Sequence, residues 1–153
     1  MKKLNNNKKG FTLIELLAVI VILAIIVMIA IPAVTKYLNA ARQGTFADNA
    51  HSAISAVRND VIKTGKGEAT YNLKAINDLL EKKLNASPFG VDYDEDSYIK
   101  VTQECDENDC TYKYTMCLAD ASGHGFKNLE ENEIDETEVA MKDISCGSST
   151  NTE

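Results

Sequence analysis

The chain has 153 residues and a formal net charge of −7, from 16 basic and 23 acidic side chains. This length suggests one modest domain in addition to any membrane segment. Acidic side chains predominate from position 91 onward. Because an acidic surface repels phosphates, we do not expect that part of the chain to bind nucleic acid.

The N-terminus combines a basic start with a long apolar run. Positions 1–10 carry four lysines and no acidic residue, and residues 16–31 carry only apolar side chains. Together with residues 11–14, this run approaches the roughly 20 residues that span a bilayer. The lysines would stay on the cytoplasmic side. The rest of the chain, with all four cysteines, would then lie outside the cytoplasm, where disulfides form.

Three interpretations of this segment compete. A cleaved secretory signal would need a small-residue cleavage site after the apolar run, and the sequence that follows is a poor one. A simple single-pass anchor explains the length but not Glu15, because a carboxylate at mid-bilayer costs about 2.5–3.5 kcal/mol. In the third interpretation, the chain is cut between Gly10 and Phe11 and the apolar helix is retained.

The sequence "KKGFTLIELLAVIVILAII" closely resembles the N-terminus of type IV prepilins and related pseudopilins. The resemblance implies that prepilin peptidase removes a leader ending at Gly10 and that the new N-terminal residue, Phe11, is N-methylated. It also implies that Glu15 pairs with the Phe11 amine of a neighbouring subunit during assembly. Pro32 lies where many of these proteins carry a helix-bending proline.

The resemblance further implies a structural protein and not an enzyme. The expected organisation is a cleaved leader (1–10), a transmembrane and filament-core helix (11–35), and the rest of the long helix with a globular head (36–153). The implied partners are further copies of the chain, prepilin peptidase, an assembly platform protein with its ATPases, and membrane lipid before assembly. The prepilin would sit in the cytoplasmic membrane, and the assembled pilus would be extracellular and act in adhesion, motility or biofilm formation. The alternatives are a pseudopilin of type II secretion or of competence DNA uptake, and a membrane-anchored binding protein that never polymerises.

Helix-compatible residues continue beyond the apolar run and predict one helix over 11–63, with a kink near Pro32 and Gly65 as the C-cap. Its outer half has two faces at 100° per residue. The first consists of Val34, Tyr37, Leu38, Ala41 and Thr45. The second consists of Phe46, Ala50, Ala53, Ile54, Val57 and Val61. We expect the second face to pack on the head and the first to contact other subunits.

The remaining pattern predicts a small antiparallel sheet, so the expected fold class is α+β, as in the pilin fold. Leucine and isoleucine at helical spacing predict a short helix within 71–84. Alternating residues predict strands over 97–105 and 110–119, joined as a hairpin. Residues 138–146 predict a weaker third strand. We expect residues 120–136 to form a surface loop and the end of the chain to be a mobile tail.

The four cysteines allow three disulfide connectivities. In the predicted hairpin Cys105 lies opposite Cys110, which favours that bridge and leaves Cys117 to pair with Cys146. The second bridge resembles the disulfide that bounds a C-terminal loop in many pilins. The spacing of the four cysteines along the chain does not favour a zinc site.

The other polar residues form no recognised catalytic or metal-binding motif. Asp92, Asp94 and Asp96 alternate as in a calcium loop, but the glycine and glutamate that such a loop requires are absent. No nucleophile motif surrounds His51 or His124. We therefore expect neither a cofactor nor a metal.

Overall fold

The computed structural model describes residues 10–106 and 109–147. The expected leader, except for Gly10, and almost all of the expected tail lie outside these residues. The chain divides between Asn39 and Ala40 into two compact units. We call residues 10–39 the N-terminal unit and the described residues from 40 onward the head, and we describe each by itself.

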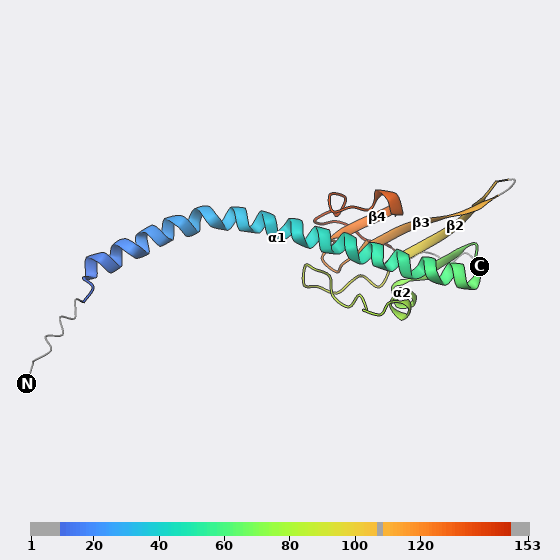
Figure 1. Ribbon diagram of the computed structural model, residues 1–153, viewed down its shortest axis with the longest axis horizontal. Coiled ribbons are helices and arrows are strands. Elements are labelled where there is room, and N and C mark those ends of the chain that lie inside the picture. Colours follow the sequence, from blue (N-terminus) through green and yellow to red (C-terminus); the bar gives the residue numbers. More distant parts are fainter. Residues whose placement is uncertain (1–9, 107–108, 148–153) are drawn as a thin grey trace, which may run out of the picture. The chain divides into compact units, whose positions relative to one another are not determined.

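One helix, α1 (Leu13–Thr64), begins in the N-terminal unit and ends in the head (Figure 1). It continues through Pro32, and its bounds confirm the expected long helix. At its end, Gly65 has a φ of +68° and its N–H bonds to the Val61 carbonyl at 2.8 Å. Gly65 is therefore the C-terminal cap, because glycine adopts this left-handed conformation without a Cβ penalty.

The head contains a four-stranded antiparallel sheet in the order β1-β2-β3-β4. The elements after α1 are β1 (Ala69–Asn72), α2 (Leu73–Leu79), β2 (Tyr98–Cys105), β3 (Cys110–Ala119), β4 (Gly125–Glu130) and the 3₁₀ turn η1 (Glu131–Glu133). The expected hairpin is confirmed as β2 and β3, and the expected short helix as α2. The sequence analysis missed β1, which is only four residues long.

Two expectations about the C-terminal third were wrong. Residues 138–146 form no strand in the structure, because a positive φ of 69° at Asp143 interrupts the extended chain, and only a single bridge joins Ala140 to Gly125. The expected surface loop instead contains β4. Gly125 has a φ of +148° and passes close to the backbone of Leu118, where a Cβ would clash. This close approach lets β4 pair with β3.

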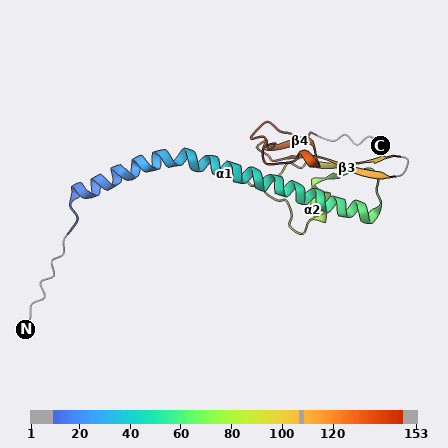
Figure 2. The ribbon, with the colours of Figure 1, turned by 45° about the horizontal axis from the view of Figure 1, so that its top comes forward.

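The core lies between α1 and one face of the sheet (Figure 2). All six members of the second helix face are buried in it, which confirms that this face packs on the head. The sheet contributes Ile99, Val101, Tyr114, Met116, Leu118 and Phe126. The first face remains exposed along its length.

Two disulfides cross-link the head, with the pairing that the sequence analysis favoured. Cys105 bonds to Cys110 at the end of the β2–β3 hairpin, where the two residues are directly paired across the strands. Cys117 bonds to Cys146 and ties the C-terminal segment to β3.

Candidate functional site

The start of α1 is closed by a reciprocal set of hydrogen bonds between Thr12 and Glu15. The backbone N–H and the hydroxyl of Thr12 each donate to the same Glu15 carboxylate oxygen at 2.8 Å. The backbone N–H of Glu15 donates to the Thr12 hydroxyl oxygen at 3.3 Å. Since α1 begins at Leu13, this is a capping box with Thr12 at the N-cap and Glu15 at the third helical position.

The sequence analysis missed this contact, although the spacing Thr-x-x-Glu before an apolar run is its signature. The capping box explains why a glutamate can occupy the start of such an apolar helix. It does not neutralise the negative charge, because the donors on Thr12 are uncharged. Glu15 is exposed, and the neighbouring Phe11 is 91% exposed. Both remain accessible to a partner, as the expected contact between subunits requires.

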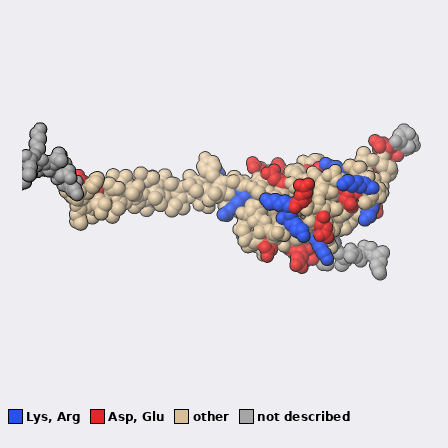
Figure 3. Space-filling view, turned by 60° about the horizontal axis from the view of Figure 1, so that its bottom comes forward, with Lys and Arg blue, Asp and Glu red and all other residues tan. Residues whose placement is uncertain are grey.

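Apolar side chains cover the N-terminal unit on all sides. Every large hydrophobic residue of this unit is exposed, from Phe11 to Leu38. The space-filling view shows almost no charge along this stretch (Figure 3). Among the described residues, α1 is the one helix long and apolar enough to cross a membrane. A surface of this extent and composition requires an apolar environment, supplied by lipid or by other protein chains.

In the head, polar side chains on one face of α1 bind the segment that follows β4. The donor and acceptor pairs are Gln43 Nε2 with the Val139 carbonyl at 2.9 Å, His51 Nε2 with the Ile134 carbonyl at 2.9 Å, and the Arg58 guanidinium with the Glu131 carboxylate. The hydrogen bond to Glu131 raises the pKa of Arg58. These contacts hold residues 131–139 along the helix, and they explain how a segment without strand pairing is ordered.

A serine, a histidine and an aspartate converge beside Gly123, but their contacts are not those of a hydrolytic triad. Asp120 is 2% exposed, and its carboxylate accepts hydrogen bonds from the Ser87 hydroxyl at 2.7 Å and from His124 Nδ1 at 2.9 Å. Catalysis would require the histidine to take the serine proton, whereas here both side chains donate to the same carboxylate. The cluster therefore cross-links the loop at Ser87 to the β3–β4 turn.

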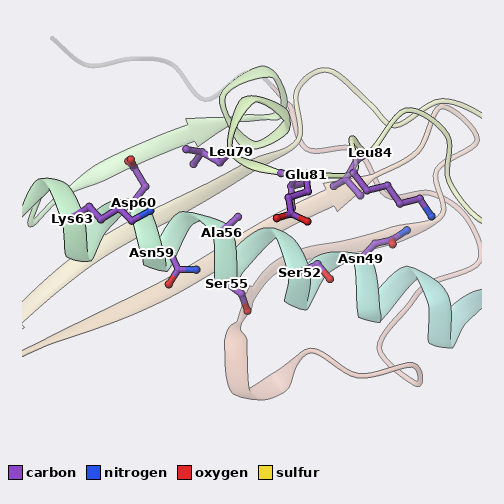
Figure 4. Close-up of a pocket in the computed structure, with 12 residues that line it drawn as sticks. Asn49, Ser52, Ser55, Ala56, Asn59, Asp60, Lys63, Leu79, Glu81 and Leu84 are labelled. Carbon is purple, nitrogen blue, oxygen red and sulfur yellow. The ribbon is translucent and has the colours of Figure 1, made fainter.

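A groove of about 580 Å³ runs between α1 and the segment that follows α2 (Figure 4). Ser52 and Asn59 line the helix side, and Leu79 and Glu81 line the opposite side. The Ser52 hydroxyl donates to the carbonyl of Asp48 in the preceding turn at 2.9 Å, so it is not activated as a nucleophile. The groove is a surface depression lined by both apolar and polar side chains, and it carries charges of both signs.

Tyr71, in β1, donates its hydroxyl to the Asp60 carboxylate at 2.8 Å. Burial and this hydrogen bond raise the pKa of Tyr71 to about 12. This contact joins β1 to the last turns of α1, next to the groove.

Within the acidic stretch 92–96, Asp94 begins a turn that is closed by the Ser97 N–H, which donates to the Asp94 carbonyl at 3.0 Å. The Asp94 carboxylate accepts a hydrogen bond from the Asp96 N–H at 3.1 Å. Within residues 10–106 and 109–147, no group of three or more His, Cys, Asp or Glu side chains is arranged to hold a metal ion.

Residues 5–31 match the family model described as the prokaryotic N-terminal methylation motif. This motif is the class III signal of type IV pilins and covers Gly10, Phe11 and Glu15. Together with the α+β fold, this match supports a type IV pilin- or pseudopilin-like protein. No curated protein and no solved structure matches the chain.

Proposed function

We propose that this protein is the structural subunit of a type IV pilus. The chain enters the cytoplasmic membrane as a prepilin and is cut between Gly10 and Phe11. The new amino terminus at Phe11 is methylated, and the subunit polymerises into a surface filament. Its partners are prepilin peptidase, the assembly platform with its ATPases, and further copies of the chain.

The observation that carries the proposal is the methylation motif on an apolar helix whose large hydrophobic side chains, from Phe11 to Leu38, are all exposed. Before assembly, lipid covers the N-terminal unit. After assembly, the same surface packs against other copies, and the kink expected at Pro32 adapts the helix to this packing. The exposed first face, with Leu38, extends the contact toward the head.

Glu15 carries the alignment of subunits in this proposal. Its carboxylate is exposed and charged, and the cut before Phe11 creates an α-amino cation at this residue, where an uncleaved chain has an uncharged amide. The carboxylate of an incoming subunit pairs with that amine on a neighbour. The capping box with Thr12 orients the carboxylate at the helix end before the partner arrives.

N-terminal mass spectrometry of material sheared from cells tests the proposal. N-methylated Phe11 in a filament fraction would support it. A chain that keeps residues 1–10, or that is found only in membranes, would contradict it and would favour an anchored, non-polymerising protein. Because pseudopilins share the motif, deletion strains separate the two classes: lost DNA uptake or lost protein secretion with no surface filament would identify a pseudopilin.

A further inference from the structure

The uncharged part of α1 matches the thickness of a bilayer and has a charged residue at each end. Glu15 and Lys36 enclose 20 residues, Leu16 to Thr35, which is about 30 Å at the helical rise of about 1.5 Å per residue and equals the hydrocarbon thickness of about 30 Å. Thr35 is the one polar side chain in between, and its hydroxyl donates to the Ile31 carbonyl at 3.0 Å. The span therefore places no unsatisfied side-chain donor in lipid.

A lysine and a tyrosine follow this span directly. Tyr37 is 77% exposed, and Lys36 is exposed beside it. Consecutive helical residues point about 100° apart, so the two side chains do not form a single stripe for one helical partner. A lysine can extend its ammonium group to the lipid phosphates. Tyrosine rings are enriched at the boundary between lipid and water.

We propose that Lys36 and Tyr37 bind the lipid head groups of the outer leaflet before assembly and so fix the depth of α1 in the membrane. The Lys36 ammonium pairs with lipid phosphate, and the Tyr37 ring lies between the head groups and the acyl chains. This inference rests on the proposed function, because it concerns the membrane stage of the subunit.

Fixing the outer end also determines where Glu15 lies. With Lys36 at the outer head groups, the Glu15 carboxylate lies at the cytoplasmic boundary and not at mid-bilayer. There it accepts hydrogen bonds from the N–H and hydroxyl of Thr12. A slide of one helical turn, about 5.4 Å toward the cytoplasm, would draw Lys36 into the hydrocarbon, and the same slide toward the outside would draw Glu15 into it. The two ends of the span therefore oppose displacement in opposite directions, and without Lys36 only the inward slide is released.

The chain contains no tryptophan, so a single introduced indole reports depth in the bilayer. We suggest preparing the full chain as Tyr37→Trp and as Ile26→Trp in phosphatidylcholine vesicles that contain one quarter phosphatidylglycerol. Lipids brominated at different depths then quench the fluorescence. The Tyr37→Trp protein should be quenched most by bromines near the head groups, and the Ile26→Trp protein by bromines near the acyl ends.

Removing the lysine should move the reporter. In the Tyr37→Trp background, Lys36→Leu should shift maximal quenching to bromines about one helical turn, or roughly 5 Å, deeper. Lys63→Leu is the matched control, because this exposed lysine lies in the last turn of α1 within the head. It should cause no shift.

The outcomes separate this inference from the pilin assignment. An unchanged quenching profile after Lys36→Leu would overturn the anchoring role of the lysine. An unquenched Tyr37→Trp protein, with Ile26→Trp quenched at the centre, would overturn the head-group contact and leave the proposed function intact. An unquenched Ile26→Trp protein would overturn both this inference and the membrane stage of the proposed function.

Discussion

The two roles of Glu15, helix capping and subunit docking, can be separated by three substitutions. Thr12→Ala removes the hydroxyl that makes two of the three capping contacts and keeps the charge. Glu15→Gln keeps an oxygen that can accept from Thr12 and removes the charge. Glu15→Ala removes both.

The expected magnitudes differ between the two roles. Loss of a helix cap costs about 0.5–2 kcal/mol, and in a helix of 52 residues this frays only the first turn. A hydrogen bond between charged groups contributes about 1.5–3 kcal/mol, so its loss raises the subunit concentration needed for assembly roughly 10- to 150-fold. If docking to the amine drives assembly, both Glu15 variants should lose filaments and Thr12→Ala should retain them.

The assay measures sheared filament protein relative to processed protein in the membrane, with mass spectrometry of the N-terminus to confirm cleavage. All three variants should be cut between Gly10 and Phe11. Normal filaments from Glu15→Gln, combined with their loss in Thr12→Ala, would refute the docking role and assign the function of Glu15 to the cap.

Four further predictions concern the head, and circular dichroism of the full chain in detergent measures each. Ile54→Ala empties a fully buried site and should lower the free energy of unfolding of the head by about 2–5 kcal/mol. Leu38→Ala, at a half-exposed site, should change this free energy by less than about 0.5 kcal/mol. The reverse order would exchange the roles of the two helix faces. Asp120→Asn should cost about 1–3 kcal/mol, because an amide nitrogen would meet donors that now bond to the carboxylate; an unchanged midpoint would show that the cluster contributes nothing. Cys146→Ser should cost about 2–5 kcal/mol by releasing the C-terminal segment, and equal midpoints for wild type and variant would contradict this. Burial and the charge of Asp120 raise the pKa of Tyr93 to about 12, although a hydrogen bond from Asn49 lowers it. The contribution of Tyr93 to stability should therefore be full below pH 10 and should be lost as the pH rises toward 12. Tyr93→Phe should reduce that loss.

The sequence predicted those features that depend on periodicity. Phe46 and Val61 belong to a face that repeats at helical spacing, and the alternation within β2 and β3 set a register that places Cys105 opposite Cys110. Such patterns arise because burial selects apolar side chains at regular intervals. They identified α1, the hairpin and the buried stripe.

The missed elements depend on contacts that leave no such period. β4 contains Asn128 at a positive φ of 56°, and the register shifts between Met116 and Leu118 where β4 pairs with β3, so its apolar residues do not alternate. Residues 131–139 are held by side chains of α1 more than seventy positions away in sequence, such as Arg58 with Glu131. Contacts of this kind are determined by the tertiary fold and are not visible in local sequence.

The position of Glu15 at the cytoplasmic end of the span affects how assembly should be understood. In the membrane, a capped carboxylate at the cytoplasmic boundary avoids most of the roughly 2.5–3.5 kcal/mol that mid-bilayer burial would cost. In the proposed filament the subunit moves outward, so this cost arises during extraction, when the carboxylate enters the hydrocarbon. A neighbouring amine at Phe11 offsets it at that step. Glu15→Gln removes both the cost and the pairing, so it eases extraction but leaves the subunit without the contact that aligns it in the filament. Loss of filaments in this variant therefore indicates that docking, and not the cost of extraction, controls assembly.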